Sequence, residues 1–303
     1  MLSLLKKILN NNFFKIILTL LILIYFYYNL DINLIKDSIK SIDLITLFTL
    51  LIILLVNPLL FVIRWFHVVK YFHKEKFIDF YTQISKGLVI SELLQNSSFL
   101  DLYKFYKLKN INLKSRFLLI FNEKIIILFT RIVFILILFT LINYYIFRVF
   151  IIENFILILI TIIFCYYIII NIKKFKDKLF INLLYNYYIK FFSKKIINRK
   201  KIFFVEILRN LILSTSYFII SINFFDTKTA LIIVIIGPII ELFLKIQFIS
   251  VIGLRELVFY FLGLVTYIDE NLLITSSIIM SFAFMFTNLI NFIISRLLIF
   301  SKN

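Results

Sequence analysis

The sequence is poor in the small and special residues that most globular domains use freely. Its 303 residues include four glycines, two prolines, two alanines and one cysteine. A single cysteine excludes an intramolecular disulfide framework. The scarcity of glycine and alanine excludes helix packing through small-residue faces of the Gly-x-x-x-Gly kind. Each glycine or proline that does occur is therefore informative about the backbone at its position.

The sequence patterns of common catalytic and metal sites are also missing. The two histidines, His67 and His73, have no nearby cluster of cysteines or carboxylates at metal-ligand spacing. No glycine-rich phosphate loop and no nucleophile elbow occur. The loops between the apolar segments are too short and irregular to hold a soluble catalytic domain. We therefore expect no enzyme activity, no metal and no cofactor.

Long apolar runs dominate what is present. Hydrophobic residues make up 62% of the chain, and the mean hydropathy is +1.03. Runs of about 18 or more apolar residues recur, which is the length that a helix needs to cross about 30 Å of hydrocarbon. Helices satisfy their own backbone groups in lipid, and the alternating pattern of a membrane barrel is absent. The sequence predicts an all-α, polytopic transmembrane helical bundle, with residues 1–303 as a single integral membrane domain.

About eight membrane spans are predicted, and one of them is irregular. Two glycines and two charges interrupt the segment 250–268, which we predict to be broken or re-entrant. The long loop 70–116 is half apolar and either lies in the membrane interface or dips into the membrane. No internal repeat is evident in the sequence. The predicted spans are Phe13–Leu30, Ile42–Ile63, Phe117–Ile142, Val149–Ile170, Ile202–Ile222, Ala230–Ile249, Ser250–Ile268 and Leu272–Ser295.

Lysine and arginine concentrate on alternate loops. Eleven lie in residues 64–124 and ten in residues 172–201, whereas the intervening loops hold few. This is the positive-inside pattern, and it predicts cytoplasmic N- and C-termini. We expect the membrane to be a bacterial plasma (inner) membrane. The net charge of +18 then reflects basic loops that face anionic lipid headgroups. No soluble basic domain is present, so we expect no nucleic-acid partner.

Charged residues within the predicted spans are candidates for a functional site, because each costs about 2.5–3.5 kcal/mol to insert. Arg255 and Glu256 follow Gly253, and a broken helix exposes backbone groups that bind ions or headgroups. The alternatives are an ion pair that only stabilises the bundle, or a cytoplasmic turn. Arg131 lies deep in the third predicted span, and Glu123 lies near its start.

Three further pairs of residues carry structural interpretations. Gly237 and Pro238 predict a kink or hinge in the sixth span. Glu241 and Lys245 follow on one helix face, and their spacing favours a structural ion pair. Arg64 and the tryptophan after it end the second predicted span, which is typical of an anchor at the level of the headgroups.

Several short motifs resemble the transmembrane region of the lysylphosphatidylglycerol synthases, also called the flippase-like domain family. The resemblance runs over almost the whole chain, and its most specific motif is Gly253-Leu-Arg-Glu256. The other matching residues are Arg64-Trp65, Asp101 with Lys104, Glu123-Lys124 and Gly263. The resemblance implies movement or presentation of anionic or glycosylated lipids between leaflets. Members that make lysyl-lipid add a soluble domain, and because this chain ends at Asn303 we expect no synthase activity.

The leading hypothesis is a flippase-like protein that translocates or presents an anionic or glycosylated lipid. In it, Arg255 neutralises a lipid phosphate and Glu256 holds Arg255 in place. Arg131, Glu123 and Arg64 are further candidate headgroup-binding residues.

Two other function classes remain open. The chain is alternatively a non-catalytic accessory subunit that recruits a glycosyltransferase or a lipid-modifying enzyme through the basic loops 173–178 and 194–201. A stable enzyme partner that is lost when these loops are neutralised would favour this alternative. A third class, an ion-coupled carrier of a soluble solute, predicts uptake that depends on Glu256 or Glu241.

Overall fold

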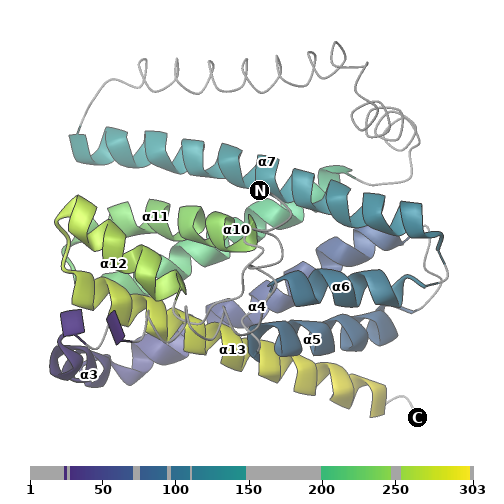
Figure 1. Ribbon diagram of the computed structural model, residues 1–303, viewed down its shortest axis with the longest axis horizontal. Helices are drawn as coiled ribbons and strands as arrows, with labels where there is room; N and C mark the ends of the chain where they lie inside the picture. The colour runs from purple at the N-terminus through teal and green to yellow at the C-terminus, as the bar shows by residue number, and fades with distance from the viewer. Residues whose placement is uncertain are drawn as a thin grey trace.

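The computed structural model describes most of the chain, and its regular structure is helical (Figure 1). The described residues are 24–25, 28–70, 76–93, 97–109, 111–147, 199–246 and 254–300. Their helices are α3 (Ile32–Lys40), α4 (Leu44–Val69), α5 (Phe77–Leu93), α6 (Ser97–Lys107), α7 (Leu113–Phe147), α10 (Arg199–Ser221), α11 (Thr227–Ile246), α12 (Leu254–Thr266) and α13 (Glu270–Phe300). Since these ranges contain no strand, the predicted all-α class is confirmed for them.

Four of the described helices are long and apolar enough to cross a membrane. They are α4, the part of α7 at Ser115–Ile142, the part of α10 at Lys200–Ser221, and α13. Both α4 and α13 expose large apolar side chains, among them Phe48 and Phe282. Exposed apolar surface of this kind suits contact with lipid. The predicted membrane character is therefore supported by length, composition and surface.

Predicted spans that fall on described residues are found as helices with shifted ends. α4 continues past its predicted end at Ile63 to Val69. α12 has 13 residues, about 20 Å of helix, which is too short to cross about 30 Å of hydrocarbon. The predicted span 13–30 lies mainly, and the span 149–170 entirely, outside the described residues. The count of eight spans therefore stays a prediction.

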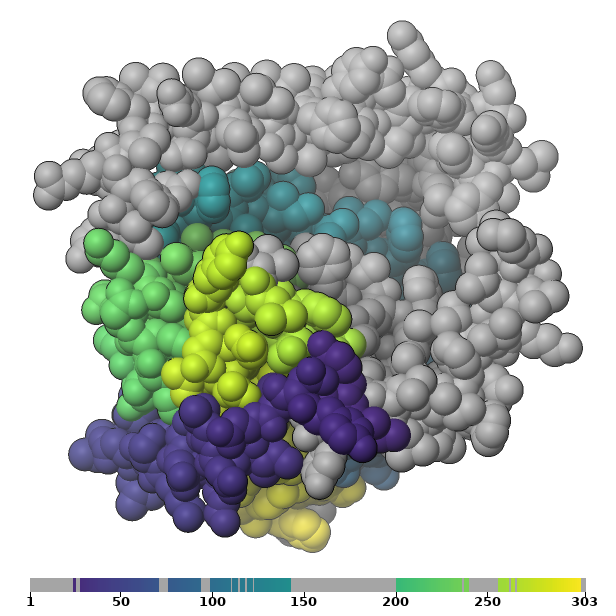
Figure 2. All heavy atoms as spheres, turned by 60° about the vertical axis from the view of Figure 1, so that its left-hand side comes forward, coloured from purple at the N-terminus to yellow at the C-terminus, as the bar shows by residue number. Residues whose placement is uncertain are grey.

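Aspartates begin four of the helices at one end of the bundle. The carboxylates of Asp31, Asp43, Asp226 and Asp269 accept hydrogen bonds from backbone N–H groups in the first turns of α3, α4, α11 and α13. Such N-caps satisfy donors that have no partner within the helix. Figure 2 shows this end, where α3 and the start of α4 (purple) lie against α12 and the start of α13 (lime to yellow).

Two stretches of chain contain the same order of helices. The first segment is α4, the pair α5 and α6, and then α7; the second segment is α10, the pair α11 and α12, and then α13. Their packing matches as well. The first helices of the two segments, α4 and α10, pack on each other. In each segment the first helix also packs on the last helix of the other segment, α4 on α13 and α10 on α7. The second helices do the same, α5 on α13 and α11 on α7. The structure therefore shows a repeat that the sequence did not reveal.

The two segments run in opposite directions. α4 and α10 are antiparallel, because Asn57 contacts Arg209, whereas Arg64, further along α4, contacts Glu206, which is earlier in α10. In Figure 1, α5 and α6 lie at the right beside the end of α13, and α11 and α12 lie at the left. The same arrangement of helices thus occurs twice with inverted orientation.

The short helices α6 and α12 begin near the middle of the long helices. Glu256, in the first turn of α12, accepts a hydrogen bond of 3.2 Å from Ser281, about 17 Å into α13. Lys104 of α6 contacts Glu123 of α7 at 2.7 Å. The start of α6, at Ser97, is seven residues before Lys104, and it therefore lies about 10 Å closer to the middle of α7 than this contact does. Neither short helix reaches across the bundle.

Two apolar clusters form the core and meet along α4. The first joins α4, α10, α12 and α13 around Leu54 and Tyr217. The second joins α4, α5 and their neighbours around Phe61 and Trp65. The charged side chains described next lie beside Phe61, within the packed interior.

Candidate functional site

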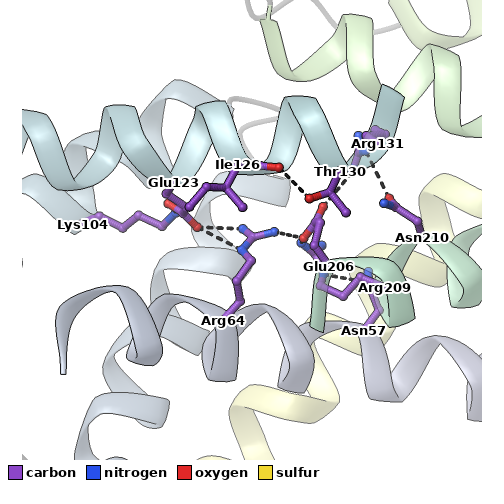
Figure 3. A network of polar contacts seen from close by, with 10 residues as sticks. All are labelled: Asn57, Arg64, Lys104, Glu123, Ile126, Thr130, Arg131, Glu206, Arg209 and Asn210. Atoms are coloured by element: carbon purple, nitrogen blue, oxygen red, sulfur yellow. Dashed lines mark hydrogen bonds and ion pairs between the residues drawn. The ribbon is translucent and has the colours of Figure 1, made fainter. Parts of the chain in front are cut away.

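Six charged side chains form a buried network inside the bundle (Figure 3). They come from α4, α6, α7 and α10, and each side chain is at most 8% exposed. The charge cluster, as we call it, consists of Arg64, Lys104, Glu123, Arg131, Glu206 and Arg209.

Arg64 bridges the two carboxylates of the cluster. Its Nη2 donates to Glu123 Oε1 at 2.7 Å and its Nε donates to the same oxygen at 3.2 Å. Its Nη1 donates to Glu206 Oε2. Lys104 Nζ donates to the other oxygen of Glu123 at 2.7 Å. Arg64 is therefore fixed from two sides, and its position depends on both glutamates.

Glu206 is shared by three guanidinium groups. Besides Arg64, Arg209 donates from Nη1 to Glu206 Oε2 at 3.2 Å. Arg131 Nη2 lies 3.6 Å from Glu206 Oε1. One carboxylate thus holds three arginines, which come from α4, α7 and α10. Positive charge is therefore most concentrated around Glu206.

Two asparagines also accept hydrogen bonds from arginines of the charge cluster. Asn57 Oδ1 accepts a hydrogen bond from Arg209 Nε at 3.0 Å, and Asn210 Oδ1 accepts one from Arg131 Nε at 3.2 Å. Asn210 is fully buried, and its Nδ2 has no hydrogen-bond acceptor among the described residues. A buried donor without an acceptor costs about 1–3 kcal/mol. The site therefore presents a donor that the fold itself does not use.

Aromatic rings enclose the cations on the side of α4. The cationic groups of Arg64, Lys104 and Arg209 lie 4.8, 4.6 and 5.2 Å from the centroid of the Phe61 ring. Lys104 Nζ also lies 4.6 Å from the Trp65 ring. These cation–π contacts stabilise charge where water is excluded.

The charge cluster has more positive than negative groups. Its four cations and two carboxylates leave a formal surplus of two positive charges among the described residues. Glu241 and Lys245 of α11, whose side chains the structure does not describe, sum to zero charge. A buried charge without its counter-charge is strongly unfavourable. An anion bound beside the arginines would reduce the imbalance among these six groups.

The structure brings together three of the residues singled out in the sequence. Arg64, Glu123 and Arg131 all belong to the charge cluster. Arg64 is not an anchor at a helix end, because α4 continues beyond it and its side chain is buried. Glu256 has its hydrogen bonds elsewhere, with the hydroxyls of Ser277 and Ser281 on α13.

The other predicted positions are only partly described. Gly253 lies outside the described residues, and Arg255 lies in the first turn of α12 with an undescribed side chain. Their roles stay predictions. α11 is helical through Gly237 and Pro238, and a Cβ on Gly237 would overlap the ring of Tyr217 on α10.

Sequence reasoning missed Glu206, Arg209 and Asn210. The two charges lie three residues apart within the predicted span 202–222, so the insertion cost that drew attention to Arg131 applies to them as well. Asn210 carries no comparable signal, since a single asparagine in a span is inexpensive beside an ion. Its importance follows only from its contact with α7.

Comparisons of the chain with protein-family models, with curated proteins and with solved structures find no match. Within the described ranges, no group of three or more His, Cys, Asp or Glu side chains is placed to hold a metal ion. The arginines and the lysine of the charge cluster are groups that can bind negative charge.

Proposed function

We propose that this protein translocates or presents the headgroup of an anionic or glycosylated lipid across a bacterial inner membrane. The observation that supports this most strongly is the cluster of four cations and two carboxylates among the described side chains, buried among helices long and apolar enough to cross a membrane. A phosphodiester headgroup carries one negative charge and offsets half of the positive surplus of these six groups. The resemblance to the lysylphosphatidylglycerol-synthase transmembrane family leads to the same expectation.

The residues have different roles in this proposal. Arg131 and Arg209 bind the phosphate oxygens, since guanidinium groups match phosphate geometry with paired N–H donors. Asn210 adds the amide donor that has no acceptor among the described residues. Arg64 positions Glu123 and Glu206 and so keeps the other cations in place. No covalent step is involved, and we assign no catalytic residue.

The two inverted segments support a transport role. Transporters built from inverted repeats hold their substrate near the bilayer midplane, at the interface of the repeats, and rock one repeat against the other. The charge cluster draws on both segments. The first contributes Arg64, Lys104, Glu123 and Arg131, and the second contributes Glu206 and Arg209.

The topology that we propose keeps about eight membrane segments, with both termini cytoplasmic. The segment 250–268 belongs to a re-entrant pair with α11 that enters from the outer side. The loop 70–116 contributes a second re-entrant pair, α5 and α6, that enters from the cytoplasmic side. Because each pair returns to its own side, the orientation of the remaining helices is the one that the positive-inside pattern predicts.

A leaflet-exposure assay tests the proposed site. The purified protein is placed in phosphatidylcholine vesicles that carry a trace of phosphatidylglycerol with a fluorescent NBD label on one acyl chain, and dithionite quenches the label that reaches the outer leaflet. We expect the wild type to accelerate exposure, and Arg131→Gln to slow it about tenfold or more, because a charged hydrogen bond is lost.

Arg296→Gln is the matched control, because Arg296 is an exposed arginine of α13 outside the charge cluster. An Arg131→Gln rate equal to that of the wild type, at equal folded protein, would contradict the site. A protein that only presents lipid predicts no exposure, but retention of phosphatidylglycerol that Arg131→Gln reduces in native mass spectrometry. Absence of both effects would reject the proposed function.

A further inference from the structure

One face of α10 is polar and buried over most of its length. The side chains that form it are Glu206, Asn210, Ser214, Tyr217 and Ser221, and each is at most 4% exposed. Their spacing by four, four, three and four residues keeps them within about 80° of one another around the helix. This α10 polar face starts in the charge cluster and ends at the last residue of α10.

Three of these side chains have a polar atom that the fold does not use. Asn210 Nδ2, Ser214 Oγ and Ser221 Oγ are buried and have no hydrogen-bond partner among the described residues. Ser216 lies on the same helix about 120° from the centre of this face. It donates instead to the carbonyl of Ile212 at 2.8 Å. A serine within a helix can bond in this way to the carbonyl oxygen four residues earlier. Three unused polar atoms on one face leave that face able to form hydrogen bonds with a polar ligand.

Tyr217 is the one aromatic side chain of the α10 polar face. Its ring is fully buried and stacks on Phe259 of α12, with centroids 6.0 Å apart. On α11 it lies against Gly237, where a Cβ would overlap the ring, so only glycine leaves room for it. The following residue, Pro238, removes a backbone hydrogen bond inside α11 and favours bending there. The ring therefore separates the charge cluster from the far end of the face, next to a helix that is able to bend.

We infer that the α10 polar face is the path of a phosphate-bearing lipid headgroup, and that Tyr217 and Phe259 form its gate. The inference rests on the proposed function and adds a route to it. The face touches α7 of the first segment through Asn210 and the pair α11 and α12 of the second through Tyr217. It therefore lies where the two inverted segments meet, and its polar atoms replace the hydration that a headgroup loses.

The test removes the unused hydroxyls. Ser214→Ala combined with Ser221→Ala is measured in the same vesicles of phosphatidylcholine with a trace of NBD-labelled phosphatidylglycerol. We expect exposure to slow about tenfold, because the headgroup loses hydrogen bonds along its route. Ser216→Ala is the matched control, since its hydroxyl is already bonded within α10, and its rate is expected to stay at the wild-type value.

A structural defect is distinguished by thermal unfolding in detergent. Removing hydroxyls that have no partner is expected to leave the melting temperature of the double variant at or above that of the wild type. In a third variant, Tyr217→Leu, removal of the ring is expected to speed exposure. Wild-type rates in the double variant would overturn the path while leaving the proposed function in place.

A second arm separates a lipid headgroup from a free anion. Vesicles loaded with inorganic phosphate are assayed for its release by the same variants. Phosphate release that needs Ser214 and Ser221, without lipid exposure by the wild type, would assign the face to a soluble anion and overturn the lipid path. A wild type that moves neither probe would reject both the path and the proposed translocation.

Discussion

Single residues in this protein are stabilised by partners that lie far away in the chain. A buried ion is unfavourable by itself, so each member of the charge cluster depends on the others. Glu206 is the most connected, because Arg64, Arg131 and Arg209 all lie against its carboxylate. Its loss would leave three guanidinium groups together without their shared counter-charge.

Replacement of Glu206 therefore tests how the cluster is held. We expect Glu206→Gln to lower the free energy of unfolding by about 3–5 kcal/mol, the usual loss when one partner of a buried ion pair is removed. Thermal unfolding in detergent measures the effect. Asp37→Asn, at an exposed position of α3, is the control and should unfold like the wild type. Equal melting temperatures for all three proteins would show that Glu206 does not hold the cluster.

At the scale of helices, close packing depends on the few glycines. Gly87 of α5 faces Tyr103 of α6, and a Cβ there would lie 2.5 Å from Cδ1 of the ring. At Gly263 of α12, a Cβ would lie 2.8 Å from the Cβ of Glu270 in α13. Gly237 meets the ring of Tyr217 in the same way. In a chain with four glycines, these three lie where another segment comes too close for a side chain.

The contact between α10 and α11 gives a prediction at this scale. Gly237→Ala is expected to destabilise the protein by about 1–3 kcal/mol, because the new methyl group forces the Tyr217 ring or α11 to move. The loss should be smaller in a Tyr217→Leu background, where the ring is absent. Unfolding of the two single variants and the double variant measures this coupling. An equal loss in both backgrounds would mean that the ring is not what Gly237 accommodates.

At the scale of the whole molecule, the described helices α4–α7 and α10–α13 form two segments in opposite orientation. The turn from α6 to α7 and the turn from α10 to α11 lie at opposite ends of the bundle (Figure 1). In the proposed topology the first faces the cytoplasm and the second faces outward. This difference is what alternating access to a central site requires.

Cysteine labelling tests the orientation of the two segments. In a Cys165→Ser background, Lys109→Cys places a single thiol at an exposed position in the turn between α6 and α7. Lys228→Cys places one at an exposed position at the start of α11, at the opposite end of the bundle. We expect an impermeant maleimide to label Lys228→Cys on intact cells and Lys109→Cys only after the membrane is opened. Labelling of both from the same side would exclude the inverted arrangement across the membrane.

The sequence by itself determined that the chain forms apolar helices, because that requirement is local. Each long apolar run must satisfy its own backbone groups in lipid, whatever its neighbours are. The cost of inserting an ion is local too, which is why Arg131 and Glu123 stood out before their partners were known. The aspartates that begin α4 and α13 are further local features.

Only the tertiary structure decided which charges meet. Arg64 and Glu206 are 142 residues apart, and their contact depends on which faces of α4 and α10 pack together. The inverted repeat was hidden for a related reason. The two segments share the lengths and directions of their helices. They do not need to share residues, because many different apolar side chains can fill the same packing positions. The unused polar atoms on α10 likewise became visible only when the neighbouring helices had enclosed them.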